Sequence, residues 1–245
     1  MLEKTRHREI VELCLASPPV NALGVKLIQS LTDALQSAMH DDSCKAVVIS
    51  GQSGIFSAGL DVREVLADQQ SRLVLVRAFM LLQETLARSI KPVFAAITGH
   101  CPAGGAVISI LCDYRIMAQG NFKIGLNEVQ VGLYPGNIAY RIFERIVGVP
   151  KAAALLPRGV MMDSAAALAV GLVDEVVAPG QVIARTLLFA TECLALPQQA
   201  YLRTRTLVRG DLVRLFNEPQ EDLAAMVANG WVTEETLVHL RAGRD

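Results

Sequence analysis

The chain has 245 residues, of which 52% are hydrophobic, and its 23 basic and 24 acidic side chains leave a formal net charge of −1. This length and apolar content suffice for one large globular domain with a sizeable core, and they exclude a disordered chain. The balanced charge and the lack of a basic block exclude nucleic acid as the expected partner. We also expect no membrane insertion, because Arg158 and Asp163 keep the longest apolar run below the roughly 18 residues that cross a bilayer.

Strands and helices alternate along the first part of the chain. Apolar spacing predicts strands over 10–16, 46–50, 93–98, 114–118 and 121–125, and helices over 24–39 and 72–88. Continuous apolar strands with helices between them indicate an α/β fold with a buried, mostly parallel sheet. From about residue 137 the chain is mainly helical, with one further strand expected over 172–177 and the only tryptophan, Trp231, in a helical tail over 219–245.

The cysteines and the N-terminus indicate a cellular compartment. The five cysteines are an odd number, lie far apart and form no C-x-x-C pair, which predicts free, mostly buried thiols in a reducing environment. The charged segment 1–9 leads directly into a strand and leaves no room for a signal peptide. We expect a cytoplasmic protein of bacterial type, or one of the mitochondrial matrix if a transit peptide has been removed.

A glycine-rich turn is the most informative motif. Residues 99–106 bring Gly104 and Gly105 into the first turn of the apolar run 107–112. The first N–H groups of a helix lack intrahelical partners, so this turn suits an oxygen that carries negative charge. The small residues of the loop 56–61 offer a second set of convergent donors. The alternative for the paired glycines is close packing of a helix on a strand.

Several other chemistries are disfavoured. The turn lacks the Lys and Ser or Thr of a P-loop, and no strand is followed by G-x-G-x-x-G, which disfavours nucleotides. No G-x-S-x-G or H-E-x-x-H string accompanies the four histidines, which disfavours a serine nucleophile and a metal site.

Glu128 is the candidate acid–base group. It lies in the stretch 124–133, which is otherwise free of charge. If its carboxylate is buried, desolvation raises its pKa toward neutrality, as suits a group that takes up and returns a proton. The alternative is a solvated loop glutamate or a helix cap, and Asn127 has the parallel alternative of a turn residue.

Four strings in chain order resemble one family. F-S-A-G-L-D at 56–61, C-P-A-G-G at 101–105, C-D-Y-R-I at 112–116 and I-G-L-N-E at 124–128 resemble the crotonase (enoyl-CoA hydratase/isomerase) superfamily. The second and fourth strings look most like the mitochondrial-type Δ3,Δ2-enoyl-CoA isomerases. The resemblance implies a crotonase-like ββα spiral over 1–190 and a helical C-terminal region over 191–245 that forms a homotrimer.

The resemblance also implies the site. The substrate would be an acyl-CoA thioester, with no cofactor beyond the coenzyme A of the substrate. Backbone N–H groups of Ala58 and Gly104 would stabilise the enolate oxygen, and Glu128 would move a proton from C2 to C4. Further substrate contacts would come from Ser57, Gly59, Leu60, Asp61, Val107 and Asn127, the loop 57–61 lining the coenzyme A path.

Within this resemblance, Val107 favours one reaction of the superfamily over the others. Hydratases of the superfamily have a second glutamate at this helix position, because adding water requires two groups, whereas a proton shuttle needs one. The substitution favours isomerisation of cis- or trans-3-enoyl-CoA to trans-2-enoyl-CoA in fatty acid β-oxidation. The alternatives are another crotonase reaction, such as hydration or thioester hydrolysis, and a catalytically silent acyl-CoA binder. The segment 133–137 departs from the isomerase pattern and leaves the preferred acyl chain open.

Overall fold

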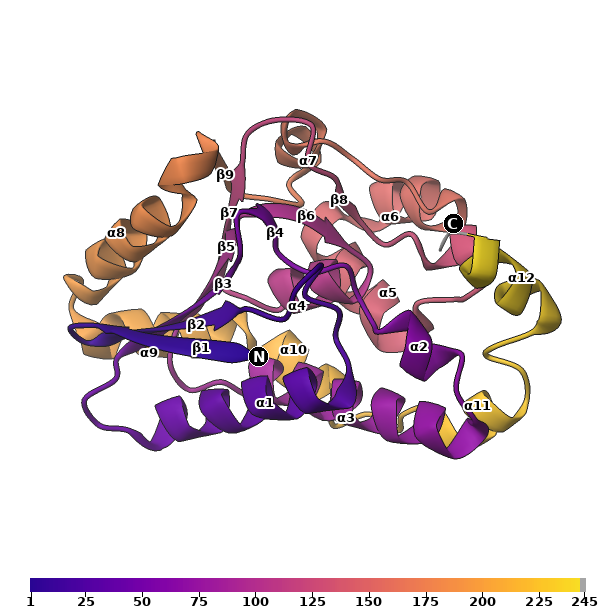
Figure 1. Ribbon diagram of the computed structural model, residues 1–245. Coiled ribbons are helices and arrows are strands. Elements are labelled where there is room, and N and C mark those ends of the chain that lie inside the picture. The colour runs from indigo at the N-terminus through magenta and orange to yellow at the C-terminus, as the bar shows by residue number, and fades with distance from the viewer. Residues whose placement is uncertain (243–245) are drawn as a thin grey trace.

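The computed structural model describes residues 1–242, the side chains of 241 and 242 excepted. Its strands form two sheets (Figure 1). The six-stranded sheet runs in the order β1 (Leu2–His7), β2 (Ile10–Leu15), β3 (Ala46–Gly51), β5 (Val93–Ile97), β7 (Tyr114–Ala118) and β9 (Glu175–Val177). The three-stranded sheet runs in the order β4 (Gly54–Ile55), β6 (Gly99–Pro102) and β8 (Ile124–Gly125). The β1–β2 pair is antiparallel and every other pairing between these strands is parallel.

Helices connect and cover the strands. The first part of the chain contains α1 (Val25–His40), α2 (Val62–Val65), α3 (Gln69–Ala87), α4 (Gly104–Ile110) and the 3-10 helix η1 (Glu128–Val131). The middle contains α5 (Gly136–Val147), α6 (Val149–Leu155), η2 (Leu156–Arg158), α7 (Ser164–Val170), η3 (Pro179–Gln181) and α8 (Val182–Leu194). The last part contains α9 (Gln198–Val208), α10 (Gly210–Leu215), α11 (Leu223–Ala228) and α12 (Glu234–Ala242).

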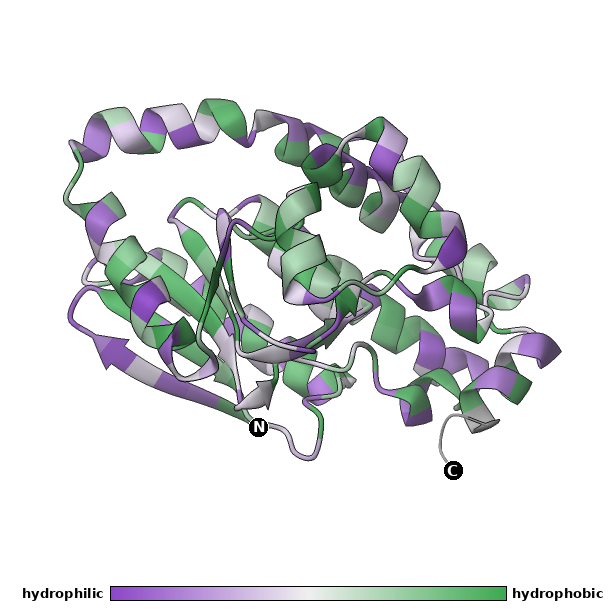
Figure 2. Ribbon diagram, turned by 90° about the horizontal axis from the view of Figure 1, so that it is seen from above, coloured by the Kyte–Doolittle hydropathy of each residue, from purple (hydrophilic) through white to green (hydrophobic). Residues whose placement is uncertain are grey.

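The central strands of the large sheet, β2, β3, β5 and β7, are buried on both faces, as their continuous apolar sequences predicted. Alternate residues of β3 enter different clusters: Val47 and Ile49 join the main core, whereas Ala46 and Val48 join the smaller core beneath α8. Figure 1 shows α8 on one side of the sheet and α4 on the other, and Figure 2 shows hydrophobic strands in the interior. The sheet is therefore the rigid layer from which the connecting loops project.

The expected strands and helices are confirmed, with differences at their ends. Helix α3 begins at Gln69, three residues before the predicted start, because the Asp68 side chain accepts a hydrogen bond from the Ser71 N–H and caps the helix. Strand β1 was missed because its sequence is charged and lies at a sheet edge, where an apolar pattern is not required. Strand β6 lies in a segment that the sequence suggested was entirely loop.

The C-terminal helices meet different parts of the molecule. Arg205 and Arg209 join α9 to the core through Asp113, to which Arg205 Nε donates at 2.9 Å and Arg209 Nη1 at 3.3 Å. Helices α11 and α12 instead lie on the far side of the molecule from α8 (Figure 1), and α11 packs on α3. The proposed boundary between 190 and 191 falls within α8 and remains a prediction, and residues 243–245 of the predicted C-terminal region lie outside the described residues.

The thiols follow the prediction from the sequence. All five cysteines are free, and four of them are buried, Cys14 being partly exposed. Burial raises the pKa of Cys101, and it raises the pKa of Cys112 to about 12. In the part of the chain that the structure describes, no helix has the length and apolar character to span a bilayer.

Candidate active site

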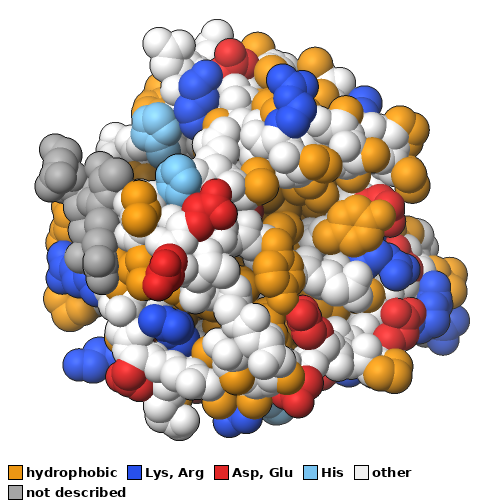
Figure 3. Space-filling view, turned by 90° about the vertical axis from the view of Figure 1, so that its right-hand side faces the viewer, with side chains coloured by type: hydrophobic (Ala, Val, Ile, Leu, Met, Phe, Trp, Pro, Cys, Tyr) orange, Lys and Arg blue, Asp and Glu red, His pale blue; other side chains and the backbone are white. Residues whose placement is uncertain are grey.

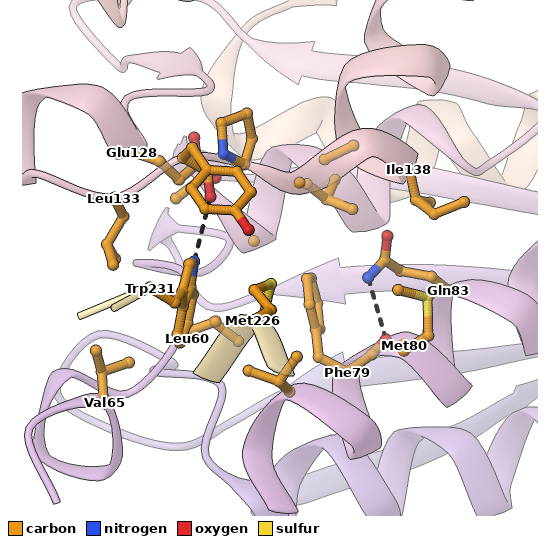
Figure 4. Close-up of a pocket in the computed structure, with 18 of the residues that line it drawn as sticks. Leu60, Val65, Phe79, Met80, Gln83, Glu128, Leu133, Ile138, Met226 and Trp231 are labelled. Carbon is orange, nitrogen blue, oxygen red and sulfur yellow. Dashed lines mark hydrogen bonds between the residues drawn. The ribbon is translucent and has the colours of Figure 1, made fainter. Parts of the chain in front are cut away.

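A cavity lies between the carboxyl ends of the small sheet, helix α3 and the tail. It is lined by residues of 58–65, the α3 residues 76–83, the turn 102–107, the stretch 127–139 and tail residues between 220 and 240. Figure 3 shows hydrophobic side chains across the centre of this face, and Figure 4 shows the side chains that point into the cavity. The lining is mostly apolar, with a few polar groups, as in pockets for small ligands.

The structure brings six of the nine candidate residues to this cavity. The residues that line it are Ala58, Leu60, Gly104, Val107, Asn127 and Glu128. Ser57, Gly59 and Asp61 are not among the lining residues. Ser57 is fully buried, where its Oγ donates to Asn21 O at 2.8 Å and accepts from Gly59 N at 3.1 Å. Asp61 caps α2 by accepting from the Arg63 N–H at 2.8 Å.

The free amide of the loop 56–61 belongs to Leu60 rather than to Ala58. The Ala58 N–H donates to Val20 O at 2.9 Å, so the expectation that this amide faces the thioester is wrong for this structure. Leu23 and Leu60 form a parallel β-bridge. The Leu23 N–H donates to the Gly59 carbonyl at 2.8 Å, and the Asp61 N–H donates to the Leu23 carbonyl at 3.2 Å. In such a bridge the central residue directs its own N–H to the other side. Leu60 N–H has no acceptor among the described residues, and Leu60 lines the cavity.

A second free amide comes from Gly104. It is the first residue of α4, where the N–H has no intrahelical acceptor. The preceding Ala103 has φ 48° and ψ −121°, a conformation that is strained for a residue with a Cβ. This turn is held by the Ala103 N–H, which donates to Gly125 O at 2.8 Å. A Cβ added to Gly59 would lie only 3.3 Å from Gly104 N, so the two loops that carry the free amides are in contact.

The second glycine of the pair is required for packing. A Cβ on Gly105 would lie 3.0 Å from Ser57 O and 3.1 Å from Ser57 Cβ. Gly105 therefore allows α4 to approach the loop 56–61. The packing alternative for the paired glycines holds at Gly105, and the donor interpretation fits Gly104.

Glu128 is the first residue of η1 and presents its carboxyl to the cavity. Its Oε2 is buried and has no hydrogen-bond partner among the described residues. Burial raises the pKa of Glu128 to about 7, and its own backbone N–H opposes that rise only in part. No neighbouring charge contributes to the shift. The solvated-loop alternative therefore does not describe this carboxyl group, which is poised to exchange a proton near neutral pH.

Val107 supplies an apolar wall of the cavity. It lies on α4, is 1% exposed and lines the same cavity. Among the described residues that line the cavity, Glu128 and Glu221 are the only acids, and Glu221 is held by the Tyr134 hydroxyl, which donates to it at 2.7 Å. Glu128 is thus the one acidic side chain of the cavity with an orphaned oxygen.

The tail forms a wall of the cavity that the sequence did not predict. Met226 and Trp231 line it, and Trp231 Nε1 donates to Tyr134 O at 3.3 Å (Figure 4). Thr236 Oγ1 donates to Gly132 O at 2.7 Å, and Gly132 N–H in turn donates to Glu128 O. A single tryptophan in a polar tail was the available signal, because such a residue needs an apolar surface to pack against.

The comparisons with known proteins place the chain in a family. The family model described as enoyl-CoA hydratase/isomerase matches residues 5–221. The chain belongs to the enoyl-CoA hydratase/isomerase family. The solved human mitochondrial Δ3-Δ2-enoyl-CoA isomerase superposes with a TM-score of 0.92 at 28% identity, over 99% of this chain and 96% of that one. The crotonase-like α/β fold expected from the four strings is therefore confirmed.

Relatives within the enoyl-CoA hydratase/isomerase family carry several names. The human peroxisomal bifunctional enzyme is 38% identical over 178 residues, which are 72% of this chain and 24% of that protein. The human mitochondrial enoyl-CoA delta isomerase 1 is 34% identical over 79% of this chain and 65% of its own length. A probable enoyl-CoA hydratase of Mycobacterium avium (strain 104) is 32% identical over 80% of this chain and 76% of its own length. The chain thus spans about a quarter of the bifunctional relative and just under two thirds of the isomerase.

Proposed function

We propose that this member of the family isomerises cis- or trans-3-enoyl-CoA to trans-2-enoyl-CoA with Glu128 as the only acid–base group. The observation that carries the proposal is the buried, unpartnered Oε2 of Glu128 in a cavity where Val107 replaces a second acid. A single carboxylate suffices when the proton that leaves one carbon is returned to another carbon of the same substrate.

The reaction follows from the groups that line the cavity. The free N–H groups of Leu60 and Gly104 donate to the thioester oxygen, which gains negative charge as the C2–H bond breaks. Glu128 accepts that proton, and the electron pair spreads over the dienolate. The same carboxyl group then protonates C4, so that the double bond moves to C2 and no atom is gained or lost. The apolar side chain of Val107 keeps water away from the intermediate.

Hydration of 2-enoyl-CoA is the second candidate, favoured by the hydratase name of one relative. The two reactions are separated by chromatography of the products from 3-hexenoyl-CoA and 2-hexenoyl-CoA. We expect 2-hexenoyl-CoA from the first substrate and no 3-hydroxyhexanoyl-CoA from the second. A 3-hydroxy product formed faster than the isomer would overturn the proposal in favour of hydration. Release of a free thiol would identify a thioester hydrolase, and binding without any product would identify a silent acyl-CoA binder.

A homotrimer is the second part of the proposal. Large apolar side chains are exposed on α8 and α9, with Leu188 at 55%, Leu207 at 82% and Val208 at 62% exposure. Apolar surface of this kind is typical of a face that a partner subunit covers. Sedimentation equilibrium at micromolar concentration tests it, and a monomer mass would overturn it. The course of the coenzyme A moiety along 57–61 also remains a prediction.

A further inference from the structure

Gln83 is a buried amide that the proposed reaction does not use. It lies on α3, is 5% exposed and lines the cavity. Its Nε2 donates to Phe79 O, one turn earlier on the same helix, at 3.4 Å. Its Oε1 is buried without a hydrogen-bond partner among the described residues. A buried acceptor without a partner is costly, so its retention in a ligand cavity points to the ligand.

The orientation of this amide is fixed by its neighbour. Exchanging the oxygen and nitrogen atoms of Gln83 would place Oε1 against the Phe79 carbonyl, and two acceptors would face each other. The oxygen therefore points away from the helix. Figure 4 shows this arrangement: the nitrogen faces the α3 backbone, and the oxygen extends toward the side where Ile138 lies. The cavity thus presents an acceptor at this point, which pairs only with a donor.

The position of Gln83 places that acceptor along the acyl chain. Phe79 Cζ lies 3.3 Å from where a Cβ on Gly104 would stand, so Phe79 adjoins the free amides. Gln83 follows one turn later on α3, a rise of about 6 Å along the helix axis. In Figure 4 Gln83 lies on the opposite side of the cavity from Glu128 and Leu133. If the thioester group of the substrate lies at Gly104, the part of the acyl chain beyond the reacting double bond therefore lies next to Gln83.

We propose that Gln83 Oε1 selects acyl chains that carry a hydroxyl group beyond the reacting double bond. This inference rests on the proposed function, because it uses the same acyl-CoA and the same site. A plain hydrocarbon chain would cover the acceptor and leave it unpaired, whereas a hydroxyl group donates to it. The neighbouring Met80 and Ile138 are apolar and supply no competing donor.

The test compares matched substrates and two variants of α3. The substrates are trans-3-decenoyl-CoA and the same chain with a hydroxyl group at C6, C8 or C10, and kcat/KM is measured for each. Gln83→Leu removes the acceptor. Thr85→Val is the matched control, because Thr85 Oγ1 likewise donates to the carbonyl one turn back (Leu81 O, 2.8 Å) but does not line the cavity. Circular dichroism and Tm establish that each variant is folded.

For the wild type and Thr85→Val, we expect kcat/KM for at least one hydroxylated chain to exceed that for the plain chain about fivefold or more. In Gln83→Leu this preference should be lost, and kcat/KM for the plain chain should rise. Equal kcat/KM within twofold for the plain and all hydroxylated chains would overturn the inference. Equal loss on all substrates in a folded Gln83→Leu protein would show a structural role only.

A binding measurement separates this inference from the proposed function. Calorimetric Kd values are compared for decanoyl-CoA and its 6-, 8- and 10-hydroxy forms, which undergo no isomerisation. Tighter binding of a hydroxylated chain that Gln83→Leu abolishes supports the inference even if no 3-enoyl-CoA is turned over. Turnover of plain 3-enoyl-CoA without any such preference leaves the proposed function intact and rejects the role of Gln83.

Discussion

The two sides of the cavity are built in different ways. The core side carries the free amides and Glu128 on loops that buried bonds hold, such as Ser57 Oγ to Asn21 O and Ala103 N to Gly125 O. The tail side is held to the stretch 132–134 by the hydrogen bonds of Glu221, Trp231 and Thr236, and it contributes mainly apolar surface. Because the core side carries the candidate acid–base group and the tail side contributes mainly apolar surface, substitutions on the two sides should change different kinetic constants.

The largest effect is expected on the core side, from Glu128→Gln. The amide has the shape of the carboxyl group but accepts no proton, so kcat should fall by about a thousandfold while the Kd for acyl-CoA changes little. Steady-state assays and calorimetry measure the two quantities. If Glu128→Gln retains turnover, Glu128 is not the acid–base group, and the chemistry can no longer be assigned to the core side alone.

The same variant should be more stable than the wild type. The folded-state pKa of Glu128, about 7, lies above its ordinary value of 4.5, so its stabilising proton is fully held below pH 4.5 and lost as the pH rises through 7. At pH 8 Glu128→Gln should therefore gain on the order of 3 kcal/mol in the free energy of unfolding, and near pH 4 nothing. Urea titrations at both pH values check this. An unchanged difference between them would mean that the carboxyl group is solvated.

The pH dependence of the wild type gives an independent measure of the same burial. The reaction needs the carboxylate form, so kcat/KM should fall about tenfold for each pH unit below 7 and be level above it. At pH 5 the loss is about a hundredfold. A profile that stays flat down to pH 5 would contradict a desolvated base on the core side.

On the tail side, Trp231→Ala should raise KM about tenfold and leave kcat nearly unchanged, because it removes buried apolar surface from the cavity wall. Trp231 is 8% exposed. Val238→Ala is the matched control: Val238 lies in the same tail, is 66% exposed and should alter neither constant. If kcat and not KM falls in Trp231→Ala, the tail takes part in the chemistry and the comparison fails.

The smallest effect is expected where the two sides meet. Thr236→Val keeps the side-chain shape but removes the donor to Gly132 O, and Gly132 N–H donates to the Glu128 carbonyl. We expect a loss of kcat of about threefold and of about 1 kcal/mol in stability. A shifted midpoint of the pH–rate profile would show that Thr236 positions Glu128. A change in Tm with an unchanged profile and kcat would restrict Thr236 to the fold.

The sequence predicted what depends on local pattern. Apolar periodicity located β3, α1 and β7, and the scarcity of charge around Glu128 marked it as a candidate, but the sequence left open whether its carboxyl group is buried or solvated. It did not predict which amide of the loop 56–61 is free, because that depends on the bridge from Leu23 to Leu60, a contact between distant segments. Gln83 was missed for a related reason: an amide on a helix is ordinary in sequence, and only the packing of α3 leaves its oxygen without a partner.

The buried thiol of Cys101 can report on the opening of the site. Its Sγ would lie 3.5 Å from a Cβ on Gly105, beneath the first turn of α4, and only a thiolate attacks a disulfide reagent. Because burial raises the pKa of this thiol, its labelling waits until the glycine turn lifts from the loop 56–61. The labelling rate at Cys101 itself therefore reports how often the loops that carry the free amides of Leu60 and Gly104 separate, and a bound ligand that holds these loops together should slow it.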